Sequence, residues 1–171
     1  MRTFIPGKLL ILLVAVNLFA GACKKKDATT PEKSEKYELV TGDWKQADIV
    51  FAVPVKLGPQ EIPAGTSIIA LAPLLGPAGE LFLCTQTNIY KFNTDGSFAI
   101  DGCTDLILPT AGNTGTWKLD VHDAVFLLTS AAGENDPHWI ETVNATDMSL
   151  SITVTVPGVA TIPLILQLQK Q

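Results

Sequence analysis

Few side chains in this sequence could do chemistry, and the densest group of them is Asp136, His138 and Glu141. Carboxylates and imidazoles are common metal ligands, so this D-x-H-x-x-E pattern is a candidate metal site. On a strand, however, residues three apart point to opposite faces, and the spacing suits a helix that this segment does not predict. The only other histidine, His122, lies in an expected turn beside acidic residues. We therefore expect no metal site.

Motifs of nucleotide-dependent and nucleophilic enzymes are missing from the sequence. It holds no G-x-S-x-G elbow, no phosphate-binding P-loop and no G-x-G-x-x-G fingerprint. A pair of carboxylates on opposing strands, as a glycosidase uses, stays open as an alternative. We expect a protein that is not an enzyme and that needs no cofactor.

Cys23 has the surroundings that point most clearly to a chemical role. Arg2 and Lys8 form a short positive region, an apolar run follows, and residues 20–22 (Ala-Gly-Ala) supply the small side chains required before a signal-peptidase cleavage point. The stretch resembles the bacterial lipobox, in which the Cys after the small residues receives the lipid. We predict a lipoprotein signal peptide over residues 1–22 and lipidation of Cys23. An ordinary secretory signal cleaved elsewhere is the alternative.

The segment that follows has the composition of a tether. Residues 24–36 (KKKDATTPEKSEK) contain no large apolar side chain, so they cannot bury enough surface to offset the entropy of ordering. We predict a flexible tether over residues 23–36 and one domain over residues 37–171. Lys24 stands where an Asp favours retention in the inner membrane of some bacteria. We therefore expect a lipid anchor in the cell envelope, at the outer membrane, on its periplasmic face or at the cell surface.

Charge excludes one class of partner. The chain has 12 Lys and Arg and 17 Asp and Glu; two cations lie in the signal, and five cations and three acids in the tether, which leaves 5 cations and 14 acids in residues 37–171, a net charge of −9. Nucleic-acid binding needs a cationic face. We therefore expect no nucleic-acid partner.

The two cysteines other than Cys23 form an even pair. In an exported and oxidising setting, Cys84 and Cys103 are expected to form a disulfide. The bond would close a loop of about 20 residues, worth roughly 3 kcal/mol. A metal site is the alternative, although the two thiols lack C-x-x-C spacing and a nearby His.

Alternating patterns predict two hairpins. Ser149–Val156 alternates apolar and polar residues without a fault, Pro157-Gly158 suits a type II turn, and the chain returns through residues 160–169, with Pro163 at a strand edge or bulge. The second hairpin spans Ile89–Asp101 and turns at residues 93–97. Its Gly96 sits where a left-handed residue is required. Parity then pairs the following residues on this hairpin: Phe92 with Phe98, Tyr90 with Ile100, and, on the other face, Lys91 diagonally with Asp101.

Further strands complete an all-β reading. Turn signals separate strands at 44–53, 116–120, 124–130 and 138–143, which gives seven or eight antiparallel strands in a sandwich or a barrel. Between Pro54 and Leu83 the sequence is apolar and rich in proline. We expect a strand over Thr66–Leu71 and a largely buried remainder, with an exposed flap for a ligand or membrane as the alternative. At most one helical turn is expected, within Leu81–Thr87.

The order of three short motifs resembles a known group of proteins. Gly42-Asp43-Trp44-Lys45, the hairpin Tyr90–Phe98 and Gly115-Thr116-Trp117-Lys118-Leu119 together resemble the lipocalin-like domains of lipoproteins from the Bacteroidetes, over residues 38–169. The resemblance implies an up-and-down barrel that can bind a ligand. It also implies a basic residue on a late strand against Trp44, and Lys170 is the only Lys or Arg after Lys118.

Two functions remain open. The first is a lipid-anchored barrel that binds a small apolar ligand in an internal pocket above roughly 300 Å³. The second is a surface module that docks an envelope protein or a glycan, with a filled core and an outer patch at Ile68–Leu75. Candidate ligand contacts are the aromatic residues, which could equally fill the core: Trp44, Tyr90, Phe92, Phe98 and Trp117.

Overall fold

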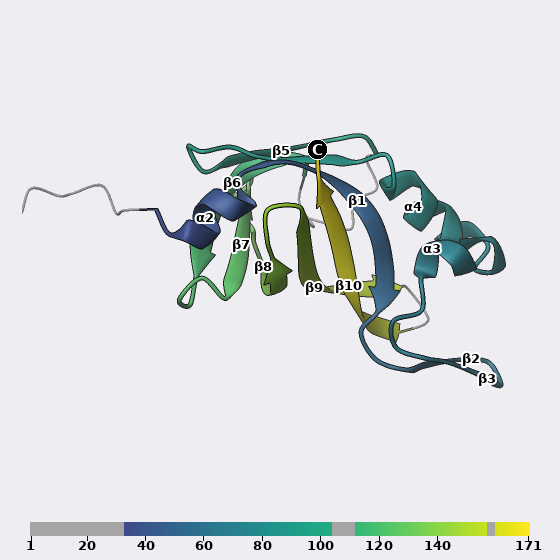
Figure 1. Cartoon of the computed structure of the whole chain (residues 1–171). Helices are drawn as coiled ribbons and strands as arrows, with labels where there is room; N and C mark the ends of the chain where they lie inside the picture. Colours follow the sequence, from purple (N-terminus) through teal and green to yellow (C-terminus); the bar gives the residue numbers. More distant parts are fainter. Residues whose placement is uncertain (1–32, 104–111, 157–159) are drawn as a thin grey trace, which may run out of the picture. The chain divides into compact units, whose positions relative to one another are not determined.

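Eight antiparallel strands form a closed barrel in the folded unit Lys33–Gln171 (Figure 1). The computed structural model describes residues 33–103, 112–156 and 160–171. Each strand from β4 to β10 pairs with the next along the chain, and β1 closes the barrel between β10 and β4. The barrel strands are β1 (Gly42–Phe51), β4 (Ile89–Phe92), β5 (Ser97–Asp101), β6 (Thr114–Asp120), β7 (Val125–Ser130), β8 (Asn135–Val143), β9 (Asp147–Val156) and β10 (Ala160–Lys170). The up-and-down barrel is confirmed, and the sandwich is excluded.

The β9–β10 hairpin follows the alternation of its sequence. Leu150 lies opposite Leu166 and Ile152 opposite Leu164, and all four side chains are buried. Each burial stabilises the fold by about 1.5–3 kcal/mol. The Pro163 carbonyl accepts a hydrogen bond from the Ala52 backbone N–H at 3.1 Å. In an antiparallel sheet the nitrogen and the carbonyl of one residue face the same neighbouring strand. The Pro163 nitrogen therefore faces β1 at the point where β1 ends. The expected edge position is thus confirmed, whereas the Pro157-Gly158 turn lies outside the described residues.

The β4–β5 hairpin has the predicted register. Phe92 pairs with Phe98 and Tyr90 with Ile100, all four buried, while Lys91 Nζ lies 2.6 Å from Asp101 Oδ2 on the outside. Gly96 has a φ of 83°, the left-handed conformation that the turn requires.

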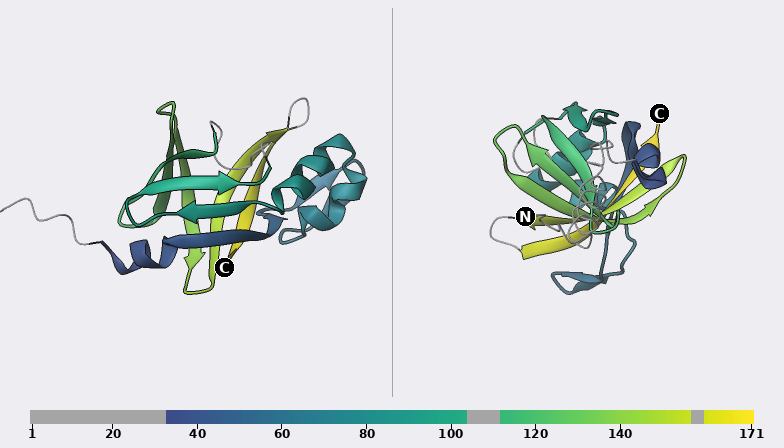
Figure 2. Two further views of the ribbon diagram at one scale, coloured as in Figure 1. Left: turned by 90° about the horizontal axis from the view of Figure 1, so that it is seen from above. Right: turned by 90° about the vertical axis from the view of Figure 1, so that its left-hand side faces the viewer.

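One end of the barrel is closed by helix α2 (Glu35–Val40) (Figure 2). Trp44 Nε1 donates to the Val40 carbonyl at 2.7 Å, and Lys170 Nζ lies 5.1 Å from the centre of the Trp44 ring and donates to the Leu39 carbonyl at 3.0 Å. A basic residue of the last strand therefore lies against Trp44. Gly42 has a φ of 130°, a backbone conformation that residues with a side chain rarely adopt, which explains the glycine two residues before Trp44.

Helix α2 begins earlier than the predicted domain boundary. The Ser34 side chain accepts a hydrogen bond from the Tyr37 backbone N–H at 3.1 Å, so Ser34 caps the helix and Glu35 opens it. The folded unit therefore takes in residues 33–36, which we assigned to the tether. The predicted signal peptide, Cys23 and the rest of the tether lie outside the described residues.

The opposite end carries the hairpin β2 (Val55–Leu57) and β3 (Gln60–Ile62), then helices α3 (Ile68–Leu71), η1 (Ala72–Leu74, a 3₁₀ helix) and α4 (Pro77–Thr85). The strand predicted over Thr66–Leu71 is wrong. Ser67 keeps one bridge to Val50, but its hydroxyl accepts from Ala70 N–H at 3.2 Å and donates to Asp48 at 2.7 Å, which caps α3. Periodicity alone does not separate a short apolar strand from a short helix.

Helix α4 is longer than the single turn expected near Leu81–Thr87. It packs closely on η1. Gly79 lies at this contact, and a Cβ atom there would come within 1.9 Å of the Ala72 carbonyl oxygen, so the close packing requires glycine. Cys84 near its end forms the predicted disulfide with Cys103, with Cα atoms 5.5 Å apart. The disulfide ties α4 to the end of β5, and the alternative of a metal site at these thiols is excluded. No helix in the described part of the chain is long and apolar enough to span a membrane.

Candidate ligand-binding site

The five aromatic residues predicted as ligand contacts lie in the packed core. Their exposed fractions run from 0 to 3 %. Phe92 and Trp117 both pack against Phe126, with ring centres 4.9 and 5.7 Å apart, and Trp117 Nε1 donates to the Asn93 carbonyl at 3.1 Å. Tyr37 of α2 stacks on Trp117 at 4.3 Å. Side chains therefore fill the barrel at the α2 end.

Polar side chains interrupt this core beside β1 and β4. The Gln46 amide is buried, and neither its oxygen nor its nitrogen has a hydrogen-bond partner among the described residues. Tyr90 is also fully buried, and desolvation raises the pKa of its phenol to about 12, partly offset by the neighbouring Asn88 amide. Asn88 accepts a hydrogen bond from the Cys103 backbone N–H at 2.6 Å, which links this region to the disulfide.

An apolar cavity of about 600 Å³ opens at the end opposite α2. Strand β1 leaves the sheet after Phe51, and pairing between β1 and β10 ends at Leu164. The residues that line the cavity come from the end of β1, the β2–β3 and α3–α4 segment, and the parts of β9 and β10 that extend past β1. Figure 1 shows these elements together at the end of the barrel away from α2. We call this cavity the mouth cavity. It is lined by Phe51, Val53, Val55, Lys56, Leu57, Ile68, Leu74, Leu75, Phe82, Val154, Thr161, Ile162, Pro163 and Leu164.

Exposed apolar side chains gather around this cavity. Among the described residues six large hydrophobic side chains are exposed, and three of them, Val53, Leu57 and Leu74, line the mouth cavity. Leu74 is 82 % exposed. Among the described residues that line the cavity, Lys56 is the only charged one. Apolar surface concentrated at a concave site is typical of ligand pockets.

The sequence indicated half of this site. We expect the apolar, proline-rich stretch from Pro54 to Leu83 to be mainly core, with an exposed flap as the alternative. In the structure some of its apolar side chains are buried and others are exposed. Ile62, Ile68 and Phe82 are buried, whereas Leu57 and Leu74 are exposed. The lining residues from β9 and β10 were missed, because they have the same alternation as buried strand residues. The signal that identifies them is length: β9 and β10 have 10 and 11 residues, and β4 and β5 have four and five.

The D-x-H-x-x-E pattern does not assemble into a metal site. His138 Nε2 lies 3.0 Å from Asp136 Oδ2 inside the barrel wall, but Glu141 is exposed and accepts a hydrogen bond from the Ser151 hydroxyl. Among the described residues no group of three or more His, Cys, Asp or Glu could hold a metal ion. His122 lies in the β6–β7 turn, where φ is also positive at Val121 and Asp123.

Comparison with known proteins adds no assignment, since no family model and no curated protein matches this sequence.

Proposed function

We propose that this protein is a lipid-anchored barrel of the cell envelope that binds a small apolar ligand in the mouth cavity. The observation that carries the proposal is the cavity itself. Its volume of about 600 Å³ lies within the range of ligand pockets, roughly 300–1,000 Å³, and its lining is almost entirely aliphatic and aromatic.

We place the ligand in the mouth cavity rather than among the aromatic side chains of the core. The closed end of the barrel is filled, as the alternative of a docking module with a filled core requires. The open end holds a cavity, as the ligand-binding hypothesis requires. An apolar ligand gains about 25 cal/mol for each Å² that it removes from water, and the half-buried Leu75 and buried Phe82 give it a lining that is already in place.

Binding is tested with N-phenyl-1-naphthylamine, a neutral probe that fluoresces in apolar surroundings. Leu57→Asp places a charge in the cavity wall and should weaken probe binding by at least about tenfold, because an unpaired carboxylate is costly in an apolar site. Leu57 is 43 % exposed, so the fold does not depend on it. Val121→Asp is the matched control, since Val121 is 54 % exposed in a turn remote from the cavity. Absence of probe binding, or equal binding by both variants, would refute the proposal.

The anchor is tested separately. Cys23→Ser should abolish incorporation of labelled palmitate and release the protein from the membrane fraction of its host. Palmitate incorporation into the Cys23→Ser variant would overturn the assignment of Cys23.

A further inference from the structure

A second pocket lies in the barrel wall between β8 and β9. The two strands pair from Val143 with Met148 up to Trp139 with Ser151, and no pair follows. Beyond this point β8 pairs only with β7, through its residues 135–138, while β9 continues to pair with β10 through residues 152–156. The two strands therefore separate and leave an opening in the wall. The opening forms a pocket of about 310 Å³, and we call this pocket the flank pocket.

The flank pocket is polar where the mouth cavity is apolar. Alternation along the strands places buried, inward-facing side chains at its floor, His138 among them, and outward-facing side chains at its rim. It is lined by Ala52, Asp136, Pro137, His138, Trp139, Ser151, Ile152, Thr153, Pro163 and Leu164. The last two also line the mouth cavity, so the two sites adjoin.

A buried imidazole at the floor calls for a hydrogen-bonding partner. His138 is 5 % exposed, and although its Nε2 lies 3.0 Å from Asp136 Oδ2, no well-aligned hydrogen bond from a described residue satisfies this nitrogen. Buried polar atoms of this kind are normally paired with protein, water or ligand. The remaining oxygen of Asp136 can accept from a second donor.

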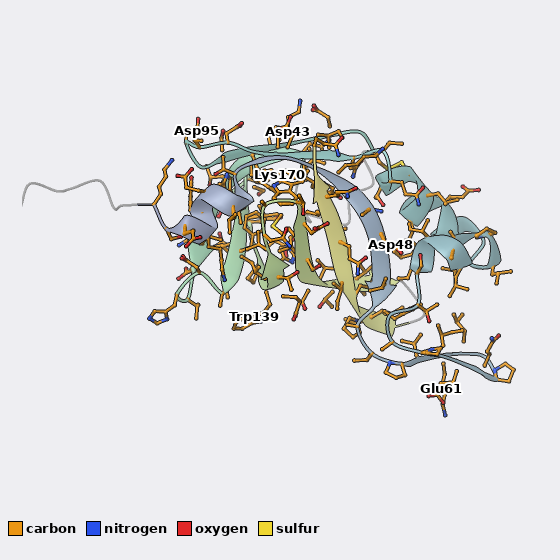
Figure 3. All side chains as sticks on the ribbon, in the orientation of Figure 1. Asp43, Asp48, Glu61, Asp95, Trp139 and Lys170 are labelled. Atoms are coloured by element: carbon orange, nitrogen blue, oxygen red, sulfur yellow. A yellow bond between two sulfur atoms is a disulfide. The ribbon has the colours of Figure 1, made fainter. Side chains whose placement is uncertain are left out.

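The rim provides a flat aromatic surface. Trp139 is 57 % exposed, and its side chain points away from the barrel (Figure 3). The Ser151 and Thr153 hydroxyls lie on the neighbouring strand at the same rim. The described residues that line the flank pocket include no Lys or Arg, which disfavours an anionic ligand.

We propose that the flank pocket binds one neutral sugar ring. The hydroxyl groups of the sugar donate to Asp136 and to the Ser151 oxygen, whose own proton goes to Glu141. They exchange hydrogen bonds with His138 and Thr153, and the C–H face of the sugar lies on the Trp139 ring. A small polyhydroxylated molecule matches both halves of the site, because it has many hydrogen-bonding groups and an apolar face. The proposal of a sugar in the flank pocket does not rest on the proposal of an apolar ligand in the mouth cavity.

Trp139 itself reports on occupancy. The chain has three tryptophans, and Trp44 and Trp117 are 0 and 3 % exposed, so acrylamide quenches mainly Trp139. Glucose, galactose, mannose and N-acetylglucosamine are each titrated into the full chain, to about 100 mM so that a millimolar Kd is reached. At least one sugar should lower the quenching constant saturably, by about half, because it covers one face of the indole. Glycerol at equal viscosity is the control and should not do so.

Two variants separate the pocket from the rest of the surface. Asp136→Asn should weaken the protecting sugar by about tenfold, because a charge-assisted hydrogen bond is lost. Thr153→Ala should also weaken it, whereas Thr155→Ala should leave it unchanged, since Thr155 is an exposed threonine of β9 outside the pocket. Probe binding in the mouth cavity should be unaffected in all three variants, which also verifies their folding. Failure of all four sugars to protect Trp139, or equal protection in Asp136→Asn and the wild type, would overturn the proposal.

Discussion

Tyr90 shows at the residue scale how the barrel interior treats a polar group. Its side chain is fully buried, so the charged phenolate would lose its hydration, and burial raises the pKa to about 12 from an ordinary value of 10.0. The neutral hydroxyl beside Asn88 is the form that the fold accepts.

A dependence of stability on alkaline pH follows. Because the pKa is higher in the folded chain than in the unfolded chain, the contribution of Tyr90 is intact below pH 10 and is lost as the pH rises to about 12. The full loss is on the order of 2–3 kcal/mol. Urea unfolding between pH 8 and pH 12 (approximate limits of the titration) should show this decline in the wild type and a smaller one in Tyr90→Phe. An identical decline in both proteins would contradict the assignment.

At the scale of elements, α2 and the end of β10 close the barrel together. Lys170 joins them, since it contacts the Trp44 ring and the last turn of α2. Its side chain is half-buried, so its contacts are only partly screened by water.

Removal of this contact should destabilise the protein. Lys170→Ala should lower the free energy of unfolding by about 1–2 kcal/mol, because it removes a cation–π contact and a hydrogen bond. Lys118→Ala is the control: its ion pair with Asp120 is exposed, and such pairs contribute little. Chemical denaturation of both variants measures the difference. Equal stabilities would show that Lys170 does not hold α2 to the barrel.

The Cys84–Cys103 disulfide is the second link between elements that stabilises the fold. Its cysteines are 19 residues apart, so replacing both with serine should cost about 3 kcal/mol. Since α4 carries Phe82 of the mouth cavity, binding of the apolar probe should weaken as well. Urea denaturation with and without reductant tests this, and the double variant should not respond to reductant. A wild type whose stability is unchanged by reductant would refute the prediction.

Which elements the sequence predicts depends on how local their signals are. The β4–β5 and β9–β10 hairpins follow from alternation, turn residues and parity, all contained within a few neighbours. Helix α3 was not predicted and α4 was expected only as a single turn, because the Ile68–Leu75 run is apolar on every side and Pro73 and Pro77 suit helix starts as well as loops. The mouth cavity could not be predicted, since it depends on β9 and β10 extending past their neighbours and on how α4 packs against that rim.

At the scale of the whole folded unit, the barrel has two different ends. Helix α2, the start of β1 and the end of β10 lie at the closed end. The described chain also begins there, at Lys33 (Figure 1). The opposite end bears the apolar mouth cavity and most of the exposed large hydrophobic side chains of the described residues. This division predicts that an apolar ligand enters and is held at one end only.

Chemical-shift mapping of side-chain methyl groups tests this claim most directly. On titration with N-phenyl-1-naphthylamine, the methyl signals of Leu57, Leu75 and Ile162 should shift in step with saturation. Those of Met148 and Leu168, which are buried near the closed end, should stay in place. Shifts confined to Met148 and Leu168, or no shifts at all, would contradict the account.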